Sequence, residues 1–232
     1  MLPLTLGLIA LLALTYAPAI AAPTWYIARL RSASRSKLVL TYDDGPSAAC
    51  PTPQILEVLR KHRAKATFFQ LGRNIAEAPV VSDRVIAEGH EIAAHSFHHF
   101  HAWKKPVHAV QDLVCGLRSV ARWTVQSRRP LYRPPYGKCN LWTLLTGACL
   151  GAQPVWWTVD SRDTWPQLPD PEVILQQLDR ENGGVVLMHD FPREPNSERA
   201  RYTVELTEKL LLLASQRGWT VCTASEMLGN KT

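Results

Sequence analysis

The chain has 232 residues and only five cysteines, and no two of these form a Cys-x-x-Cys pair. This spacing argues against a structural zinc cluster, which usually takes its ligands from such pairs. In an oxidising compartment the cysteines could form at most two disulfides and leave one thiol, with the pairing undecided. The five are Cys50, Cys115, Cys139, Cys149 and Cys222. The sequence also lacks repeats and low-complexity tracts, so we expect one folded domain.

Charged side chains are absent from residues 1–22, a leucine-rich stretch that ends in the small residues Ala19-Ile20-Ala21-Ala22. This pattern predicts a secretory signal peptide and an extracytoplasmic protein: secreted, periplasmic or in the cell envelope. Because the stretch also lacks the basic residues that usually precede a signal core, an uncleaved membrane anchor of about 20 residues stays an alternative.

Basic residues exceed acidic ones, 26 against 20, which gives a formal net charge of +6. Four of them, Arg29, Arg31, Arg35 and Lys37, crowd the region just before the first expected strand. We interpret residues 23–36 as a basic linker that is either solvated or in contact with anionic lipid or an acidic wall polymer. We expect no nucleic-acid partner and a monomeric protein.

Short apolar or β-branched runs alternate with stretches of helical character along the rest of the chain. The expected strands span residues 37–42, 66–70, 91–94, 130–133, 154–159, 184–188 and 219–223. The expected helices span residues 52–63, 74–88, 106–126, 138–150, 170–180 and 199–216. Strands that alternate with helices predict a parallel α/β sheet, closed into a barrel or doubly wound.

Polar residues of catalytic types follow these runs directly. They are Asp43, Asp44, His95, Arg133, Asp160, Asp163 and His189. In an α/β barrel the active site lies at the carboxyl ends of the strands, so this distribution predicts a catalytic mouth. Adjacent carboxylates at Asp43 and Asp44 repel each other, which favours a cation or base between them, although the following Gly-Pro also fits a surface turn.

Five motifs, in this order, resemble those of the polysaccharide deacetylases, the NodB-homology family or carbohydrate esterase family 4. They are Thr41-Tyr42-Asp43-Asp44-Gly45-Pro46-Ser47, His95-Ser96-Phe97-His98-His99, Arg133-Pro134-Pro135-Tyr136-Gly137, Val159-Asp160-Ser161-Arg162-Asp163 with Trp165, and Leu187-Met188-His189-Asp190. The resemblance covers a domain at residues 37–228. It implies a distorted, TIM-barrel-like (β/α) barrel of about seven parallel strands, in agreement with the strands counted above.

His95 and His99 are four residues apart, a spacing that places both imidazoles on one side of a helical turn and within reach of one ion. With Asp44 they offer three ligands and leave coordination open for water and substrate, as catalytic zinc sites do. The resemblance selects these residues over His98 and His101. It implies a divalent metal, Zn²⁺ first, with Co²⁺, Mn²⁺ or Ni²⁺ as alternatives.

The resemblance also assigns roles to the remaining motif residues. Asp43 would be the general base, kept ionised by a bidentate pair with Arg133. The backbone N–H of Tyr136 would stabilise the oxyanion, and His189 would be the general acid that protonates the leaving amine. Asp160 and Asp163 are both candidates for pairing with Arg133 or His189.

Leu187 and Trp165 resemble the walls of a small pocket for the acetyl methyl group. In the family an Asp is commonly followed directly by Trp, whereas here Thr164 stands between Asp163 and Trp165. Either the loop bulges at Thr164 and Trp165 still reaches the pocket, or a different residue forms the wall.

The resemblance implies a hydrolase of linear amides that removes N-acetyl groups from a GlcNAc-containing glycan, such as chitin, chito-oligosaccharides or peptidoglycan, and releases acetate. One alternative is a related metal-dependent amidohydrolase that acts on a non-sugar amide. A second is a non-catalytic glycan-binding relative, against which the complete set of motif residues argues.

Overall fold

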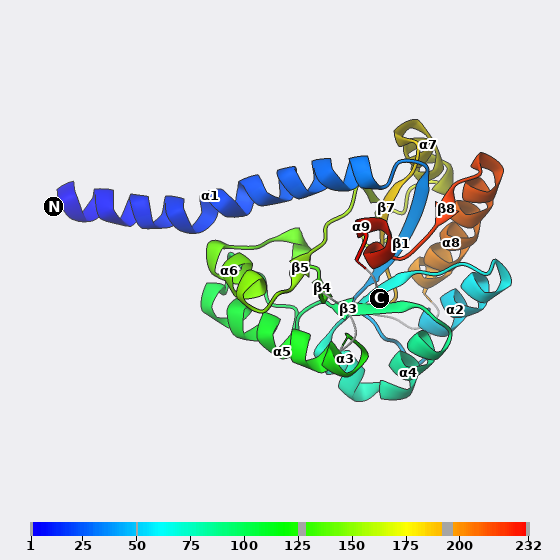
Figure 1. Ribbon diagram of the computed structural model, residues 1–232, viewed down its shortest axis with the longest axis horizontal. Helices are drawn as coiled ribbons and strands as arrows, with labels where there is room; N and C mark the ends of the chain where they lie inside the picture. The colour runs from blue at the N-terminus through cyan, green and yellow to red at the C-terminus, as the bar shows by residue number, and fades with distance from the viewer. Residues whose placement is uncertain (1, 50, 125–128, 192–196, 231–232) are drawn as a thin grey trace.

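The computed structural model describes residues 2–49, 51–124, 129–191 and 197–230. Its strands form one curled, parallel sheet in the order β5-β4-β3-β2-β1-β7-β6, and β8 pairs with the beginning of β1 (Figure 1). The strands are β1 (Lys37–Asp43), β2 (Thr67–Gln70), β3 (Glu91–Ala94), β4 (Leu131–Tyr132), β5 (Gln153–Pro154), β6 (Val159–Asp160), β7 (Gly184–His189) and β8 (Thr220–Val221). The distorted barrel predicted from the sequence is confirmed.

Most helices connect the strands and cover the outer face of the sheet, whereas buried residues of the first and last helices pack in a second apolar cluster with Val39. The helices are α1 (Leu2–Ala33), α2 (Thr52–Lys61), α3 (Gly72–Glu77), α4 (Pro79–Ala87), α5 (Pro106–Thr124), α6 (Leu141–Cys149), α7 (Pro171–Glu181), α8 (Glu198–Arg217) and α9 (Ala224–Leu228), with a 3₁₀ turn at Pro135–Gly137. The start of α7 follows from its sequence: Asp170 caps the N–H of Glu172, and Pro171 needs no hydrogen bond at the first position.

Two expected elements are divided in the structure. The helix expected at 74–88 is α3 followed by α4, because Pro79 has no N–H to continue the first helix and begins the second. The strand expected at 154–159 is β5 and β6, which lie at opposite ends of the sheet order. Residues 155–158 connect these two ends: the N–H of Val155 bonds to Tyr132 beside β5, and the N–H of Thr158 bonds to Val185 of β7.

The alternation of side chains along β1 places the catalytic types inside the barrel. Leu38, Leu40 and Tyr42 pack outward with the helices, whereas Val39 joins a second apolar cluster in the interior. Since side chains alternate along a strand, Asp43 points to the same side as Val39, at the carboxyl end of the strand.

The helix α1 runs past the barrel, and its N-terminal turns extend beyond the body of the molecule (Figure 1). Leu30 is buried, and the ring of Tyr26 packs on that of Trp156 with centroids 5.2 Å apart. The stretch expected as a linker is therefore helical as far as Ala33. Among the described helices, α1 is long and apolar enough over Leu11–Ala33 to cross a membrane by length and composition.

All four cysteines that the structure describes are free thiols, of which Cys139 and Cys222 are buried and Cys115 and Cys149 are exposed. The fifth, Cys50, lies outside the described residues. The described part of the chain thus contains no disulfide.

Candidate metal centre and active site

The turn after β1 is held from below by the buried carboxylate of Asp190. This carboxylate accepts hydrogen bonds from the N–H of Gly45 at 3.0 Å and from the hydroxyl of Thr52 at 2.7 Å. A Cβ at position 45 would collide with the same carboxylate, so only glycine fits there. Asp44 adopts a left-handed conformation with φ 75°, which aspartate tolerates better than most residues. The turn thus holds two neighbouring carboxylates in fixed places.

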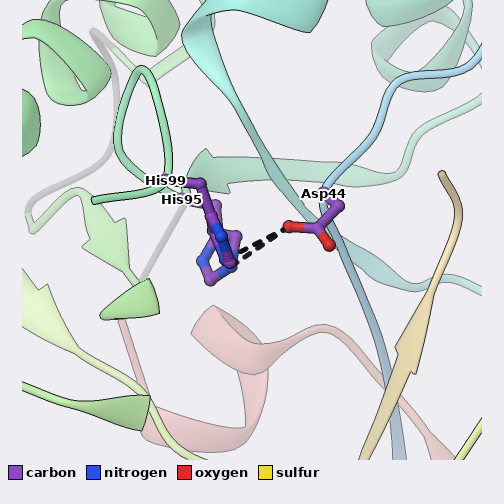
Figure 2. A group of neighbouring side chains, drawn as sticks. All are labelled: Asp44, His95 and His99. Atoms are coloured by element: carbon purple, nitrogen blue, oxygen red, sulfur yellow. Dashed lines mark hydrogen bonds and ion pairs between the residues drawn. The ribbon is translucent and has the colours of Figure 1, made fainter. Parts of the chain in front are cut away.

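The ligand atoms of Asp44, His95 and His99 converge at this edge of the barrel (Figure 2). Asp44 Oδ1 lies 3.5 Å from His95 Nε2 and 3.4 Å from His99 Nε2, and the two Nε2 atoms are 3.2 Å apart. Oδ1 of Asp44 is buried and accepts no hydrogen bond, so it keeps a lone pair directed at the group. These three residues fit a divalent metal ion.

The surroundings of both histidines favour the neutral imidazole that metal binding requires. Burial, reinforced by the neighbouring His99, lowers the pKa of His95 to about 3, and burial lowers the pKa of His99. Nδ1 of His95 lies 2.9 Å from the carbonyl oxygen of Arg133. With the proton on Nδ1 donated to this carbonyl, Nε2 presents its lone pair to the metal site.

His95 and His99 lie on a loop after β3, and the helical turn expected from their spacing is absent from this described stretch. Left-handed conformations at Ser96 (φ 67°) and His99 (φ 71°) bend the loop so that the two Nε2 atoms meet. The buried carboxylate of Asp112 on α5 fixes the bend, because it accepts the N–H groups of His98 at 2.7 Å and Phe100 at 3.0 Å.

The two other histidines of this loop contribute no atom to the group of ligands. Nδ1 of His98 faces Asp112 at 3.1 Å. Nδ1 of His101 accepts the N–H of Trp103, and its ring stacks on that of Tyr136 with centroids 5.0 Å apart.

Arg133 is fully buried and bonds in four directions. One Nη1 proton goes to Asp43 Oδ1 at 2.7 Å and another to the hydroxyl of Thr41 at 2.9 Å. Nε and Nη2 donate to the carbonyl groups of Val155 and Trp156, each at 3.1 Å. The bidentate pair expected from the sequence is therefore replaced by a single bond to Asp43, because the rest of the fork holds the segment that closes the barrel.

Asp43 is 3% exposed, and its environment keeps it available for proton transfer. Burial raises the pKa of this carboxyl above its ordinary value, while the charges of Arg133 and His189 act in the opposite direction. A carboxylate with a raised pKa accepts a proton more readily than one on the surface, which is the property that a general base needs.

His189 at the end of β7 pairs with Asp163. Its Nδ1 lies 2.8 Å from Asp163 Oδ1, and its backbone N–H donates to Oδ2 at 2.7 Å. Burial disfavours the imidazolium, but the Asp163 carboxylate more than offsets this and raises the pKa of His189 to about 10. Asp160 instead accepts the backbone N–H of Arg162 at 2.8 Å. Of the pairings left open by the sequence, the structure thus contains Asp163 with His189, while Arg133 bonds to Asp43.

A cavity of about 740 Å³ opens over these groups. It is lined by both aspartates of the β1 turn, by His95, His99 and His189, and also by Tyr136, Trp157, Asp160, Asp163, Thr164 and Leu187. Leu187 and Tyr136, which were expected to contact the substrate, thus both line this cavity.

Trp165 differs from its expected place, since it is not among the lining residues. It is 49% exposed, and the guanidinium of Arg162 lies over its ring. Thr164 lines the cavity, and the aromatic residues that line it are Tyr136, Trp157 and Phe191. This favours the alternative in which a different residue forms the wall.

Asp112 and Asp190 are the supporting residues to which sequence reasoning gave no role. Asp112 shares a helix face with the buried Ala109, Leu113 and Gly116. A single acidic residue on an otherwise apolar helix face indicates a buried carboxylate with a specific partner, and this pattern could have identified Asp112 from the sequence. Asp190 follows His189 directly, and nothing in the local pattern indicates that it turns inward to Gly45.

A curled parallel sheet with a His-His-Asp group, a buried carboxylate and a charged imidazole at its carboxyl edge defines an α/β-barrel hydrolase. The chain belongs to the polysaccharide deacetylase family, whose model matches residues 31–155. Its named relatives are deacetylases, which are hydrolases that act on amides.

Named relatives agree with this assignment. A peptidoglycan-N-acetylglucosamine deacetylase of Bacillus cereus is 31% identical over 90% of this chain and 96% of its own length. A chitooligosaccharide deacetylase of a Bradyrhizobium species is 36% identical over 73% of this chain and 76% of its own.

Solved structures share the fold. A family 4 carbohydrate esterase from Streptomyces lividans in complex with acetate has a TM-score of 0.69 and 27% identity, over 86% of this chain and 98% of the other. A family 4 pseudoenzyme from Bacillus anthracis matches with a TM-score of 0.68 and 26% identity, over 84% and 66%. Within this fold, turnover therefore depends on the residues at the site.

Proposed function

We propose that this protein is a metal-dependent N-deacetylase that removes acetyl groups from a GlcNAc-containing glycan and releases acetate. The observation that carries the proposal is the convergence of Asp44, His95 and His99 between two charge-paired groups, Asp43 with Arg133 and His189 with Asp163. An acid and a base on either side of a metal-type site are what amide hydrolysis needs.

Asp44, His95 and His99 would hold the ion, with Zn²⁺ first and Co²⁺, Mn²⁺ or Ni²⁺ as alternatives. When bound, such an ion polarises the amide carbonyl and makes water a stronger nucleophile at neutral pH. Asp43, fixed by Arg133, accepts the proton of the attacking water. His189, held as an imidazolium by Asp163, donates a proton to the departing amine. The backbone N–H of Tyr136 donates to the oxygen on which negative charge develops.

We further propose that the protein is an extracytoplasmic monomer in which the N-terminal stretch is a signal or anchor. The apolar turns of α1 that extend beyond the barrel support this, as do the relatives whose names refer to peptidoglycan.

Acetate release tests the proposal. Chito-oligomers, peptidoglycan fragments and small non-sugar amides would each be incubated with enzyme that has been stripped by chelation and reloaded with Zn²⁺, Co²⁺, Mn²⁺ or Ni²⁺. We expect acetate from the glycans only after metal is restored. Turnover confined to small amides would indicate the alternative amidohydrolase, and glycan binding without acetate would indicate a non-catalytic relative.

A further inference from the structure

Two arginines line the cavity without a role in the chemistry above. Arg73 lies in the first turn of α3, after β2, and Arg199 lies in the first turn of α8, after β7. Because β2 and β7 flank β1 at its carboxyl end, these arginines stand on opposite sides of the Asp43–Asp44 turn. Both residues are exposed.

Neither guanidinium has an acidic partner among the residues that the structure describes. Arg199 donates one hydrogen bond to the carbonyl oxygen of Trp165 at 3.1 Å, which satisfies only part of its fork. Other arginines on the described surface form ion pairs with a carboxylate, as Arg217 does with Asp179 and Arg122 does with Asp83. At the cavity, carboxylates are plentiful, yet they are engaged with other partners.

The charges of the cavity can be paired one by one. Asp43 bonds to Arg133, Asp163 bonds to His189, and Asp44 belongs to the metal site. Asp160 is the remaining acid, and one of its oxygens accepts the N–H of Arg162. With a divalent ion in place, the four acids are balanced by Arg133, His189 and the two charges of the ion, so Arg73 and Arg199 give the cavity a net positive charge that attracts an anion.

Because the acetyl group and the sugar hydroxyls are neutral, the anion that this charge favours before hydrolysis is a substituent elsewhere on the substrate. Arginine binds a carboxylate through two parallel, charge-assisted hydrogen bonds, which neutral hydroxyls cannot match in strength. A cavity of about 740 Å³ lies in the range that takes a ligand larger than a single small group, and it leaves room for a substituted neighbouring sugar.

We propose that Arg73 and Arg199 select a glycan with a carboxylate beside the acetamido sugar, such as a strand that alternates GlcNAc with N-acetylmuramic acid, over a neutral chito-oligosaccharide. The proposal rests on the proposed function and refines its substrate class. The relatives named for peptidoglycan and for chito-oligosaccharides leave both classes open, whereas these two cations distinguish them.

The test compares three tetrasaccharides of equal length: GlcNAc only, GlcNAc alternating with N-acetylmuramic acid, and the same acidic tetrasaccharide with its lactyl carboxylates reduced to alcohols. We expect the wild-type enzyme to have a higher kcat/KM for the acidic substrate than for the other two. The ratio of acidic to reduced substrate should fall by about tenfold or more in Arg73→Gln or Arg199→Gln, the usual worth of a charge-assisted hydrogen bond. Arg73→Lys should restore part of it.

Arg180→Gln is the matched control, since Arg180 is exposed on α7 away from the cavity and its removal lowers the net charge equally. It should leave the ratio unchanged. Equal losses on acidic and reduced substrates in the Arg73 and Arg199 variants, or a wild-type enzyme indifferent to the carboxylate, would overturn the proposal. Absence of acetate from all three substrates would instead count against the deacetylase function itself.

Discussion

The imidazole of His95 has a different task at each nitrogen, because Nδ1 faces the carbonyl of Arg133 while Nε2 faces Asp44 and His99. We predict that His95→Ala weakens Zn²⁺ binding by more than about 100-fold and abolishes acetate release, since two ligands remain where three are needed. Isothermal titration with Zn²⁺ measures the affinity, and acetate release measures the activity.

His98→Ala is the control, because His98 lies in the same loop and contacts Asp112 without contributing to the ligand group. It should keep most of the affinity for zinc. Full zinc binding in His95→Ala together with its loss in His98→Ala would show that the ligand set has been misassigned.

The Asp163 carboxylate keeps His189 protonated, and this has a measurable consequence for the pH profile. The acid form of His189 is present below its pKa of about 10 and is lost as the pH rises through that value. In Asp163→Asn the negative charge is gone, so the alkaline limb of kcat should move to lower pH by about 1 to 3 units. An unchanged limb would mean that another group supplies the proton.

At the scale of elements, the loop that carries His99 depends on one buried acid of α5. Burial alone would raise the pKa of Asp112, but the N–H groups of Phe100 and His98 hold it below the usual value. We predict that Asp112→Ala lowers zinc affinity by about 10-fold to 100-fold, the range for residues that orient metal ligands.

Asp83→Ala is a suitable comparison, because Asp83 makes surface contacts with Arg122 and Trp123 far from the ligands. Zinc affinity and the melting temperature of the metal-free protein would be measured for both variants. A lower melting temperature with unchanged zinc affinity would limit Asp112 to a role in folding.

Trp156 connects the helix α1 to residues of the active site. The carbonyl of Trp156 accepts Nη2 of Arg133, its indole N–H donates to the carbonyl of Gly137 at 3.0 Å, and its ring packs against Tyr26. Trp156 thus links α1 to both the general base and the Tyr136 turn.

We predict that Tyr26→Ala lowers kcat by about tenfold with little change in KM. Without the packing of Tyr26, Trp156 would no longer hold Arg133 and the Tyr136 turn in their catalytic positions. Tyr26→Phe keeps the ring and should retain activity, and Ile20→Ala, at an exposed position of the same helix, should be neutral. Steady-state kinetics of the three variants would settle this. A Tyr26→Ala enzyme that melts earlier yet turns over normally would contradict it.

Some elements follow directly from the sequence, and others depend on distant parts of the chain. The strand expected at 91–94 has the same bounds as β3, because a short apolar run between polar residues has few alternatives. The division of 154–159 could not be foreseen, since it depends on the gap between the two end strands of the curled sheet, which residues 155–158 span.

The same holds at the site. The motifs predicted the place of Asp44, His95, His99, Arg133 and His189, because side chains that follow parallel strands meet at one edge. The single bond from Arg133 to Asp43 and the exposure of Trp165 were not predictable, because both depend on which backbone carbonyls and loops happen to lie within reach.

At the scale of the whole molecule, His90 links stability to pH. It is 6% exposed and neither ring nitrogen has a partner. Burial, reinforced by Lys65, lowers its pKa to about 4. Because the unfolded chain binds this proton at a pKa of about 6.5, the free energy of unfolding is highest above that pH and declines as the pH falls towards 4.

We predict that in His90→Leu the fall of the unfolding free energy between pH 6.5 and 4.5 is smaller by roughly 1 to 3 kcal/mol. Urea unfolding of the metal-free protein at several pH values measures it, and His108→Leu, at an exposed position on α5, is the control. Parallel pH curves for wild type and His90→Leu would refute the assignment.

The four hydrogen bonds of Arg133 also affect which active-site residues would be lost first in a relative that no longer needs catalysis. In a lineage released from selection for catalysis, loss of Arg133 would still be purged, since its guanidinium joins the closing segment to the interior of the barrel. Loss of Asp43 would strand that buried cation, which is costly in itself. His189 is partly exposed at the rim, and without its ring the Asp163 carboxylate would still accept the backbone N–H of residue 189 and the hydroxyl of Thr203. In a relative that has lost catalytic function we therefore expect Arg133 to be retained and His189 to be replaced.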